Sequence, residues 1–241
     1  MSRLITLDET DSTNSYIRAH LSELSDGDAV TALLQTAGRG RRGHSWSPDR
    51  EMLPLSVLLR RPPYPAAVTL CAGVAVCRAL KALCADFPET GIKWPNDIIV
   101  GGFKVCGILC ESLCFGDRFD IICGIGVNLS QTRAHFDAIG LPHAASVKEL
   151  SGITPDRNAL ALDIVSRLRE LCKKDFSEIR GEYSELCLTL GREVRIMSEN
   201  GERRAFAQGI AENGFLICRD ESGEFEVNSG EVSVRGLLGY V

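Results

Sequence analysis

The chain has 241 residues, and its 27 Lys and Arg residues against 32 Asp and Glu residues give a formal net charge of −5. Hydrophobic residues make up 44 % and charged residues 24 %, a globular composition that excludes a disordered chain. The mild acidity disfavours a protein that coats nucleic acid or an anionic membrane. Charged residues interrupt the least polar stretch, residues 66–87, so no membrane span is expected. The first residues lack an apolar signal core, and we therefore expect a cytoplasmic protein.

The ten cysteines contain no CxxC pair and are irregularly spaced. Most of them lie among apolar residues, where a free cysteine behaves as a small buried hydrophobe. Cys106, Cys110 and Cys114 recur every four residues, and in a strand neighbours at this spacing lie about 13 Å apart, too far to share a metal. The pattern favours buried thiols in a reducing compartment over disulfides or a metal site.

The first sixty residues predict three strands and one helix. Ser12 or Thr13 would cap the helix, and its apolar stripe continues to Leu24. The expected elements are a strand at 4–7, a helix that opens at 11–14, a strand at 29–34, a polar glycine-rich stretch at 36–50 and a strand at 55–59.

The middle of the chain predicts two long helices and a hairpin. Residues 66–85 are apolar almost all round, which is typical of a helix buried against a sheet. Gly101-Gly102 separates two apolar runs and predicts a two-residue hairpin turn between strands 98–100 and 103–109, with another strand at 121–127. A further helix would start at Thr154-Pro155. Its inward stripe would be Leu160, Ile164, Leu168 and Leu171.

The residue pattern changes from about Gly191. Short alternating strands are expected, separated by polar turns that contain glycine. They indicate a small β-barrel attached to an α+β domain. The expected strands are 192–197, 204–211, 215–219, 224–227 and 232–235.

Three segments carry candidate chemistry, and the first is GRGRRGHSW at residues 38–46. Glycine lets the backbone approach a ligand closely, and the arginine fork suits phosphate or carboxylate. A solvated basic loop or a local RNA contact is the alternative. Trp46 would either stack on a purine base, worth about 1–3 kcal/mol, or belong to the core.

The second segment is KWPND at residues 93–97, whose proline forces the chain to bend at a strand end. With Gly101-Gly102 as the turn, Asp97 would face Cys106 and lie diagonal to Lys104, with about 7–8 Å between the Cα atoms. This cation and carboxylate would flank one polar ligand, or form an ordinary surface salt bridge.

The third segment is GIGVN at residues 124–128. Glycine within a strand indicates close approach to the backbone, and Asn128 at the strand end can hydrogen-bond a ligand. Taken alone, a bulged strand with a turn asparagine explains this segment equally well.

In this order, the motifs resemble those of biotin–protein ligases over nearly the whole chain. They are Ser12-Thr13-Asn14, the GRGRRG loop that ends in Trp46, KWPND, KVCGIL at 104–109 and GIGVN, with SGEVSVR at 229–235 similar to the family's terminal barrel. The resemblance implies an α+β fold: a central mixed or antiparallel sheet with flanking helices, as in class II aminoacyl-tRNA synthetases, plus a small C-terminal SH3-like β-barrel. It implies a catalytic domain at 1–188 and a barrel domain at 189–241. Since no winged helix precedes residue 1, a short, monofunctional form is expected.

The resemblance also implies an activity. Such a ligase joins biotin to ATP to give biotinyl-5′-AMP, and passes the biotin to a lysine of a biotin carboxyl carrier protein. Biotin, ATP and Mg²⁺ would be required, and no protein nucleophile. The expected partner is the carrier subunit of a biotin-dependent carboxylase, with no nucleic acid or membrane partner and with a homodimer as a further expectation.

Carried over residue by residue, the resemblance assigns the site. Lys104, Arg39 and Asp97 would be catalytic, with Lys104 at the biotin carboxylate and the α-phosphate. The remaining assignments are Ser12, Thr13, Asn14 and Gln35 for biotin; Gly38, Arg39, Gly40 and Arg41 for a loop over biotin and phosphates; Asn96 and Asp97 for the phosphate–metal side; Gly107 and Gly126 for backbone access; Asn128 for the nucleotide side; and Trp46 for the adenine.

Three residues depart from the family pattern. His44 stands where a further arginine is frequent, and Pro54 where an aromatic residue is common. Cys106 replaces a frequent alanine beside Lys104, which suggests sensitivity to thiol reagents.

The alternative functions are a lipoate or octanoate ligase of the same superfamily, a non-catalytic biotin- or nucleotide-binding regulator, and an RNA-binding module built on the arginine loop.

Overall fold

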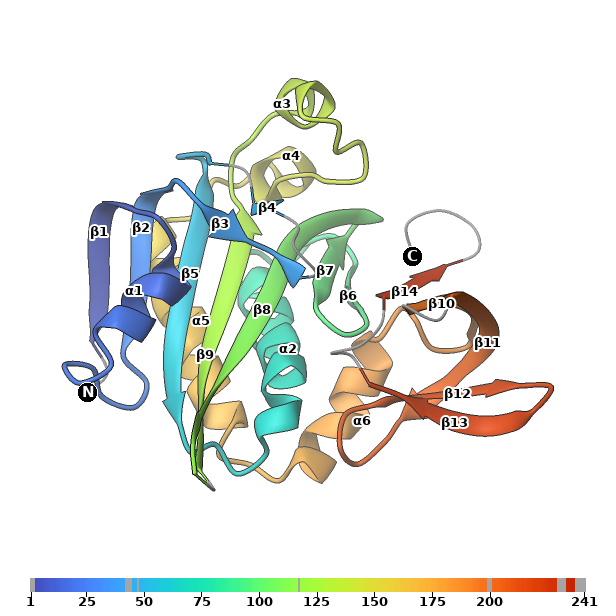
Figure 1. Ribbon diagram of the computed structural model, residues 1–241. Helices are drawn as coiled ribbons and strands as arrows, with labels where there is room; N and C mark the ends of the chain where they lie inside the picture. The colour runs from blue at the N-terminus through green and yellow to red at the C-terminus, as the bar shows by residue number, and fades with distance from the viewer. Residues whose placement is uncertain are drawn as a thin grey trace.

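The computed structural model describes residues 3–41, 45–46, 48–116, 118–198, 201–228 and 233–236. A large sheet with helices on both faces is followed by a smaller sheet (Figure 1). The strands are β1 Leu4–Thr10, β2 Ala29–Gln35, β3 Gly38–Arg39, β4 Ser45–Trp46, β5 Met52–Arg60, β6 Thr90–Lys93, β7 Asp97–Val100, β8 Phe103–Phe115, β9 Arg118–Asn128, β10 Arg192–Ser198, β11 Gly201–Ile210, β12 Leu216–Asp220, β13 Gly223–Val227 and β14 Ser233–Gly236. The helices are α1 Thr13–Ala19, the short 3-10 helix η2 Pro65–Ala67, α2 Val68–Lys81, α3 Arg133–Ala138, α4 Val147–Ser151, α5 Arg157–Leu171 and α6 Phe176–Leu186.

Seven strands of the described chain form the large sheet, in the order β1-β2-β5-β9-β8-β7-β6. Only β1 and β2 run parallel among its pairs, so the sheet is mixed. Alternate residues of each strand point to opposite faces. One face packs on α2 and α5, and the other carries α1 and the strands β3 and β4 (Figure 1). The sheet therefore separates the α2 and α5 layer from the side that carries α1, β3 and β4.

The main core lies between the sheet and α2 with α5. The helix α2 is buried on every side except at a few polar positions, as its apolar sequence predicts. The predicted inward stripe of α5 is confirmed, because its four residues are at most 3 % exposed. Removing one such side chain costs a transfer term and a cavity term, about 2–5 kcal/mol for Leu→Ala.

The hairpin of β7 and β8 forms around Gly101-Gly102 as predicted, but the predicted register is wrong at one point. Ile99 pairs with Lys104, whereas Asp97 pairs with Gly107 and not with Cys106. A β-bulge between the two pairs adds one residue to β8. Because a bulge shifts the alternation by one residue, Lys104 and Gly107 both line the same cavity above the sheet.

The helix starts also differ from the prediction. Asp156, not Thr154, caps α5, and its carboxylate accepts a hydrogen bond from the Ala159 N–H. Ser12 precedes α1, but its side chain makes no capping hydrogen bond, and α1 ends at Ala19 rather than continuing with its stripe. The helices α3, α4 and α6 had no predicted counterpart, because few of their residues are buried apolar ones.

The C-terminal strands form a five-stranded antiparallel sheet in the order β13-β12-β11-β10-β14. Trp94 joins it to the large sheet: the indole is 2 % exposed, and its Nε1 donates to the Gly214 carbonyl over 3.3 Å. The predicted fold class is confirmed, with a mixed central sheet, flanking helices and a small C-terminal β unit. The boundary at 188/189 stays a prediction.

The cysteines are all free thiols, and every one of them lies within the described residues. Cys71, Cys77, Cys106, Cys123, Cys187 and Cys218 are buried. Within the described parts of the chain, no helix combines the length and apolar character needed to cross a bilayer.

Candidate ligand site above the central sheet

A cavity of about 630 Å³ opens above the middle of the large sheet, a size suited to small-molecule ligands. The structure brings the predicted site residues to it with one exception: Gly38 is not part of the lining. The predicted residues that line the cavity are Ser12, Thr13, Asn14, Gln35, Arg39, Gly40, Arg41, Trp46, Asn96, Asp97, Lys104, Gly107, Gly126 and Asn128.

The strand register builds the floor of this cavity in two rows. In the first row Gly124 lies between Ser56 and Leu109. A Cβ atom at Gly124 would come within 2.5 Å of the Asn14 Oδ1, so glycine is required there for the asparagine to lie on the floor. The absence of a side chain at Gly124 thus leaves room for the Asn14 amide above the sheet.

In the second row Gly126 and Gly107 face each other across β9 and β8, with Pro54 and Asp97 on either side. A Cβ atom at either glycine would lie 2.9 Å from the Trp46 ring. The indole therefore rests on this glycine pair. The predicted role of these glycines, backbone access for a ligand, stays a prediction.

A network of polar side chains lies at one end of the cavity, where Thr13, Asn14, Gln35 and Glu111 are part of the lining and Ser56 is buried behind them. The Thr13 N–H donates to the Gln35 Oε1 over 2.9 Å. Ser56 Oγ lies 2.7 Å from the Thr13 Oγ1 and 2.6 Å from the Asn14 Oδ1. The Asn14 Nδ2 donates to Glu111 over 2.7 Å. We call these five residues the head group.

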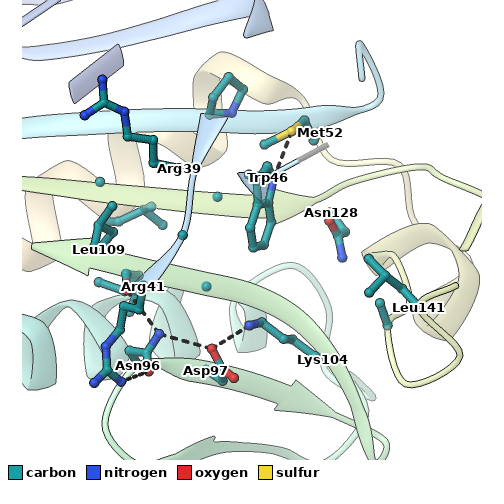
Figure 2. A pocket seen from close by; sticks show the side chains of 18 of the residues that line it. Arg39, Arg41, Trp46, Met52, Asn96, Asp97, Lys104, Leu109, Asn128 and Leu141 are labelled. Carbon is teal, nitrogen blue, oxygen red and sulfur yellow. Dashed lines mark hydrogen bonds and ion pairs between the residues drawn. The ribbon is translucent and has the colours of Figure 1, made fainter. Parts of the chain in front are cut away.

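Charged side chains gather at the other end, on the KWPND turn and on β8 (Figure 2). Lys104 Nζ lies 2.7 Å from the Asp97 Oδ1, which confirms the predicted proximity of these two residues. The Arg41 Nη1 donates to the Asn96 Oδ1 over 2.7 Å, and the Asn96 Nδ2 lies 3.2 Å from the Asp97 Oδ1. Two cations from different segments therefore meet around one amide and one carboxylate.

The backbone of Lys104 is itself fixed beyond the bulge. Its N–H donates to the His143 carbonyl over 2.8 Å, and its carbonyl accepts from the Ala145 N–H over 3.0 Å. The lysine side chain points into the cavity beside Trp46, with 5.8 Å between Nζ and the ring centroid. Position and direction of this cation thus follow from the strand pairing.

The arginine-rich segment forms a small antiparallel ladder, in which Gly38 pairs with Trp46 and Arg39 pairs with Ser45. Gly38 packs on the head group, since a Cβ atom there would meet the Gln35 Nε2 at 2.5 Å. Arg39 is exposed and points in a different direction from Arg41 in Figure 2. The position of His44 lies outside the described residues.

Asn128, Pro54 and Cys106 each have a clear place. The Asn128 Nδ2 donates to the Ala145 carbonyl over 3.1 Å, which ties the loop before α4 to the floor of the cavity. Pro54 lies where the pairing of β5 with β2 has ended, so β2 requires no N–H from it. The hypothesis of a reagent-sensitive Cys106 is not supported, because this thiol is fully buried in the core and burial raises its pKa well above the usual range.

Sequence reasoning missed Ser56 and Glu111, which both bond to Asn14, and Arg195, which reaches the cavity from the C-terminal sheet. The available signal was a lone polar residue within an apolar strand: Ser56 is the only polar side chain between Met52 and Leu59. No comparable signal marks Arg195, because only the tertiary structure brings β10 to the cavity.

Within the described part of the chain, no group of three or more His, Cys, Asp and Glu side chains is placed to hold a metal ion. Magnesium commonly binds through substrate phosphates and one or two carboxylates rather than in an all-protein cage. Asp97 at the cationic end is a carboxylate suited to that mode.

The mixed sheet and its cavity, polar at one end and cationic at the other, define a protein that holds small anionic ligands. Comparison with known proteins makes this specific. The model of the biotin/lipoate A/B protein ligase family matches residues 7–128, and the model of the biotin protein ligase C terminal domain matches residues 189–235. The chain belongs to the biotin/lipoate A/B protein ligase family.

Similar proteins cover almost the whole chain. The bifunctional ligase/repressor BirA of Salmonella typhimurium is 34 % identical over 234 residues, which are 93 % of this chain and 72 % of that protein. The biotin--[acetyl-CoA-carboxylase] ligase of Mycobacterium tuberculosis is 33 % identical over 93 % of this chain and 86 % of its own. The solved biotin protein ligase of Aquifex aeolicus in complex with biotin and ATP is 31 % identical, with a TM-score of 0.81 over 98 % of this chain and 100 % of that one.

Proposed function

We propose that the protein is a biotin ligase, which makes biotinyl-5′-AMP from biotin and ATP and transfers the biotin to a lysine of a biotin carboxyl carrier protein. The observation that carries this conclusion is that one cavity is lined by Thr13, Asn14 and Gln35 at one end and by Lys104, Arg41 and Asp97 at the other. A solved relative binds biotin and ATP, and another relative is a biotin--[acetyl-CoA-carboxylase] ligase. These relatives support both substrates and the carrier domain for this chain.

The first step has to bring a carboxylate to a polyanionic triphosphate. A biotin carboxylate oxygen attacks the α-phosphorus, the bond to the leaving oxygen breaks, and pyrophosphate departs. Cations that offset the repulsion between the two anions lower this barrier, and so does fixed positioning of the reactants. Lys104 is assigned to the biotin carboxylate and the α-phosphate, because its Nζ points into the cavity beside Trp46. Arg39 and Arg41 are assigned to the phosphates from the overlying segment.

Asp97 has two effects on this site. At 2.7 Å it holds the lysine side chain in place before the substrates arrive. It also offers a carboxylate to the Mg²⁺ that accompanies ATP, which we write as part of the Mg·ATP substrate. Asn96 orients both partners, since it bonds to Arg41 and lies beside Asp97.

The polar end of the cavity is assigned to the biotin ring system. Ser12, Thr13, Asn14 and Gln35 are buried at the closed end, where polar groups that hydrogen-bond a ligand discriminate strongly against analogues lacking the partner atoms. Trp46 is part of the cavity lining, which supports stacking of its indole against a planar ring, the adenine in this proposal. Asn128 lies at the nucleotide side.

In the second step the lysine amine of the carrier attacks the acyl carbon of biotinyl-5′-AMP, an amide bond forms, and AMP leaves. This chemistry needs no protein nucleophile. The carrier domain is the proposed macromolecular partner, and the free thiols support a reducing compartment such as the cytoplasm. The homodimer and the absence of a nucleic-acid partner stay predictions.

Radiolabelled biotin, Mg·ATP and a purified carrier domain test the function. Label should appear on the carrier with its acceptor lysine and not on a Lys→Arg carrier. Lipoate or octanoate in place of biotin should give no transfer, which separates the proposal from the lipoate ligases of the same superfamily. Transfer of lipoate but not of biotin would overturn the proposal, as would binding of biotin and ATP without any transfer.

A further inference from the structure

A chain of short contacts runs through the head group and ends on a carboxylate. Its consecutive contacts join Thr13 to Ser56 at 2.7 Å, Ser56 to Asn14 at 2.6 Å and Asn14 to Glu111 at 2.7 Å. The first three residues are at most 7 % exposed, so water does not substitute for these bonds. Glu111 lies at the outer end, where Arg18 reaches its second oxygen over 3.2 Å.

Counting hydrogens fixes the direction of the two bonds that join Ser56, Asn14 and Glu111. An ionised carboxylate only accepts, so Asn14 must turn its Nδ2 to Glu111 and its Oδ1 to Ser56. An amide oxygen also only accepts, so the one hydroxyl hydrogen of Ser56 is donated to Asn14. The hydroxyl hydrogen of Thr13 then goes to Ser56 Oγ at 2.7 Å or to Gln35 Oε1 at 3.2 Å, and in both cases it is used within the protein. The donors of Ser56 and Asn14 therefore both point toward Glu111.

This direction decides what the buried end of the cavity offers a ligand. Both hydroxyl hydrogens are used within the protein, and the Asn14 Nδ2 also lies 3.5 Å from the Leu109 carbonyl, which uses its second hydrogen. Thr13 and Asn14, which line the cavity, therefore retain oxygen lone pairs for a ligand. An acceptor-rich surface favours ligand groups that donate, such as N–H, and disfavours a second acceptor at the same place. The ureido ring of biotin carries two such N–H groups.

We propose that Glu111 is a positioning residue that sets the direction of this hydrogen-bond chain and thereby selects a ligand with N–H donors. The proposal rests on the proposed function, because it names biotin as the ligand. It differs from a purely structural role, in which Glu111 and Arg18 form a partly exposed ion pair of small energetic value.

Calorimetric binding of biotin without ATP separates the two roles. Glu111→Ala removes the acceptor, so the amide of Asn14 is free to flip, and the Kd for biotin should rise about tenfold, the equivalent of one hydrogen bond. Glu111→Gln keeps one acceptor oxygen and should restore most of the affinity. Arg18→Ala removes the same ion pair but leaves the chain intact, so its Kd should stay within about twofold of wild type.

Selectivity is the second readout, and a structural role would not change it. The probes are the two cyclic carbamate analogues of biotin, in which one ureido N–H is replaced by oxygen. Wild type should prefer biotin over at least one of them, and Glu111→Ala should lose most of this preference. Equal effects of Glu111→Ala and Arg18→Ala on biotin affinity would overturn the proposal, as would an unchanged preference. Failure of the wild type to bind biotin would instead overturn the proposed function.

Discussion

The substitution Gly124→Ala adds a single methyl group and directly tests whether the Asn14 amide lies on the sheet as described. The φ of Gly124 lies outside the left-handed region, so alanine strains no backbone there. The added Cβ would lie 2.5 Å from the Asn14 Oδ1 and 3.0 Å from its Nδ2. Such distances are too short for carbon, and the amide must therefore move away from the floor.

The movement breaks contacts that can be counted. Asn14 is bound to Ser56 at 2.6 Å and to Glu111 at 2.7 Å, and it is only 7 % exposed. A neutral hydrogen bond contributes about 0.5–1.5 kcal/mol and one to a charged group about 1.5–3 kcal/mol. Loss of one to two such bonds at the ligand-facing surface gives about 1.5–3 kcal/mol, which weakens biotin binding about 10- to 150-fold.

Isothermal titration of Gly124→Ala with biotin measures this loss, and ATP binding should change much less because the cationic end is untouched. Gly181→Ala on α6 is the matched control, since a Cβ atom there meets nothing within 4 Å. It should keep wild-type affinity. If Gly124→Ala binds biotin as wild type does, Asn14 is not part of the biotin site as assigned and the reasoning fails.

Three further predictions follow from the same structure. Lys104→Ala should lower biotin-dependent ATP–pyrophosphate exchange by at least about 100-fold with an unchanged melting temperature, as expected for a lost charge-stabilising donor; near wild-type exchange would refute this role. Iodoacetamide should modify the exposed Cys114 first and spare activity, because Cys106 is buried with a raised pKa; inactivation that tracks modification of Cys106 by mass spectrometry would contradict this. Leu168→Ala should lower the unfolding free energy by about 2–5 kcal/mol in urea titration, and a loss below about 1 kcal/mol would show that the side chain is not packed as described.

Local patterns in the sequence were sufficient for the elements with strong signals. The all-round apolar residues of α2, the 3.6-residue stripe of α5 and the glycine pair of the β7–β8 turn each state a physical requirement directly. The short helices α3, α4 and α6 have weaker patterns, because much of their surface faces solvent. Their positions depend on packing against the rest of the fold.

The sequence alone determined which chemical groups the site contains and in which order they occur, since Arg39, Arg41, Asp97 and Lys104 stand in short recognisable segments. Only the tertiary structure decided which of them meet. The bulge in β8 places Lys104 on the cavity face. The register of four strands places Gly124 beneath Asn14, and Gly107 with Gly126 beneath Trp46. Contacts between residues distant in sequence, such as that of Asn14 with Glu111, arise from strand pairing, which a local residue pattern does not encode.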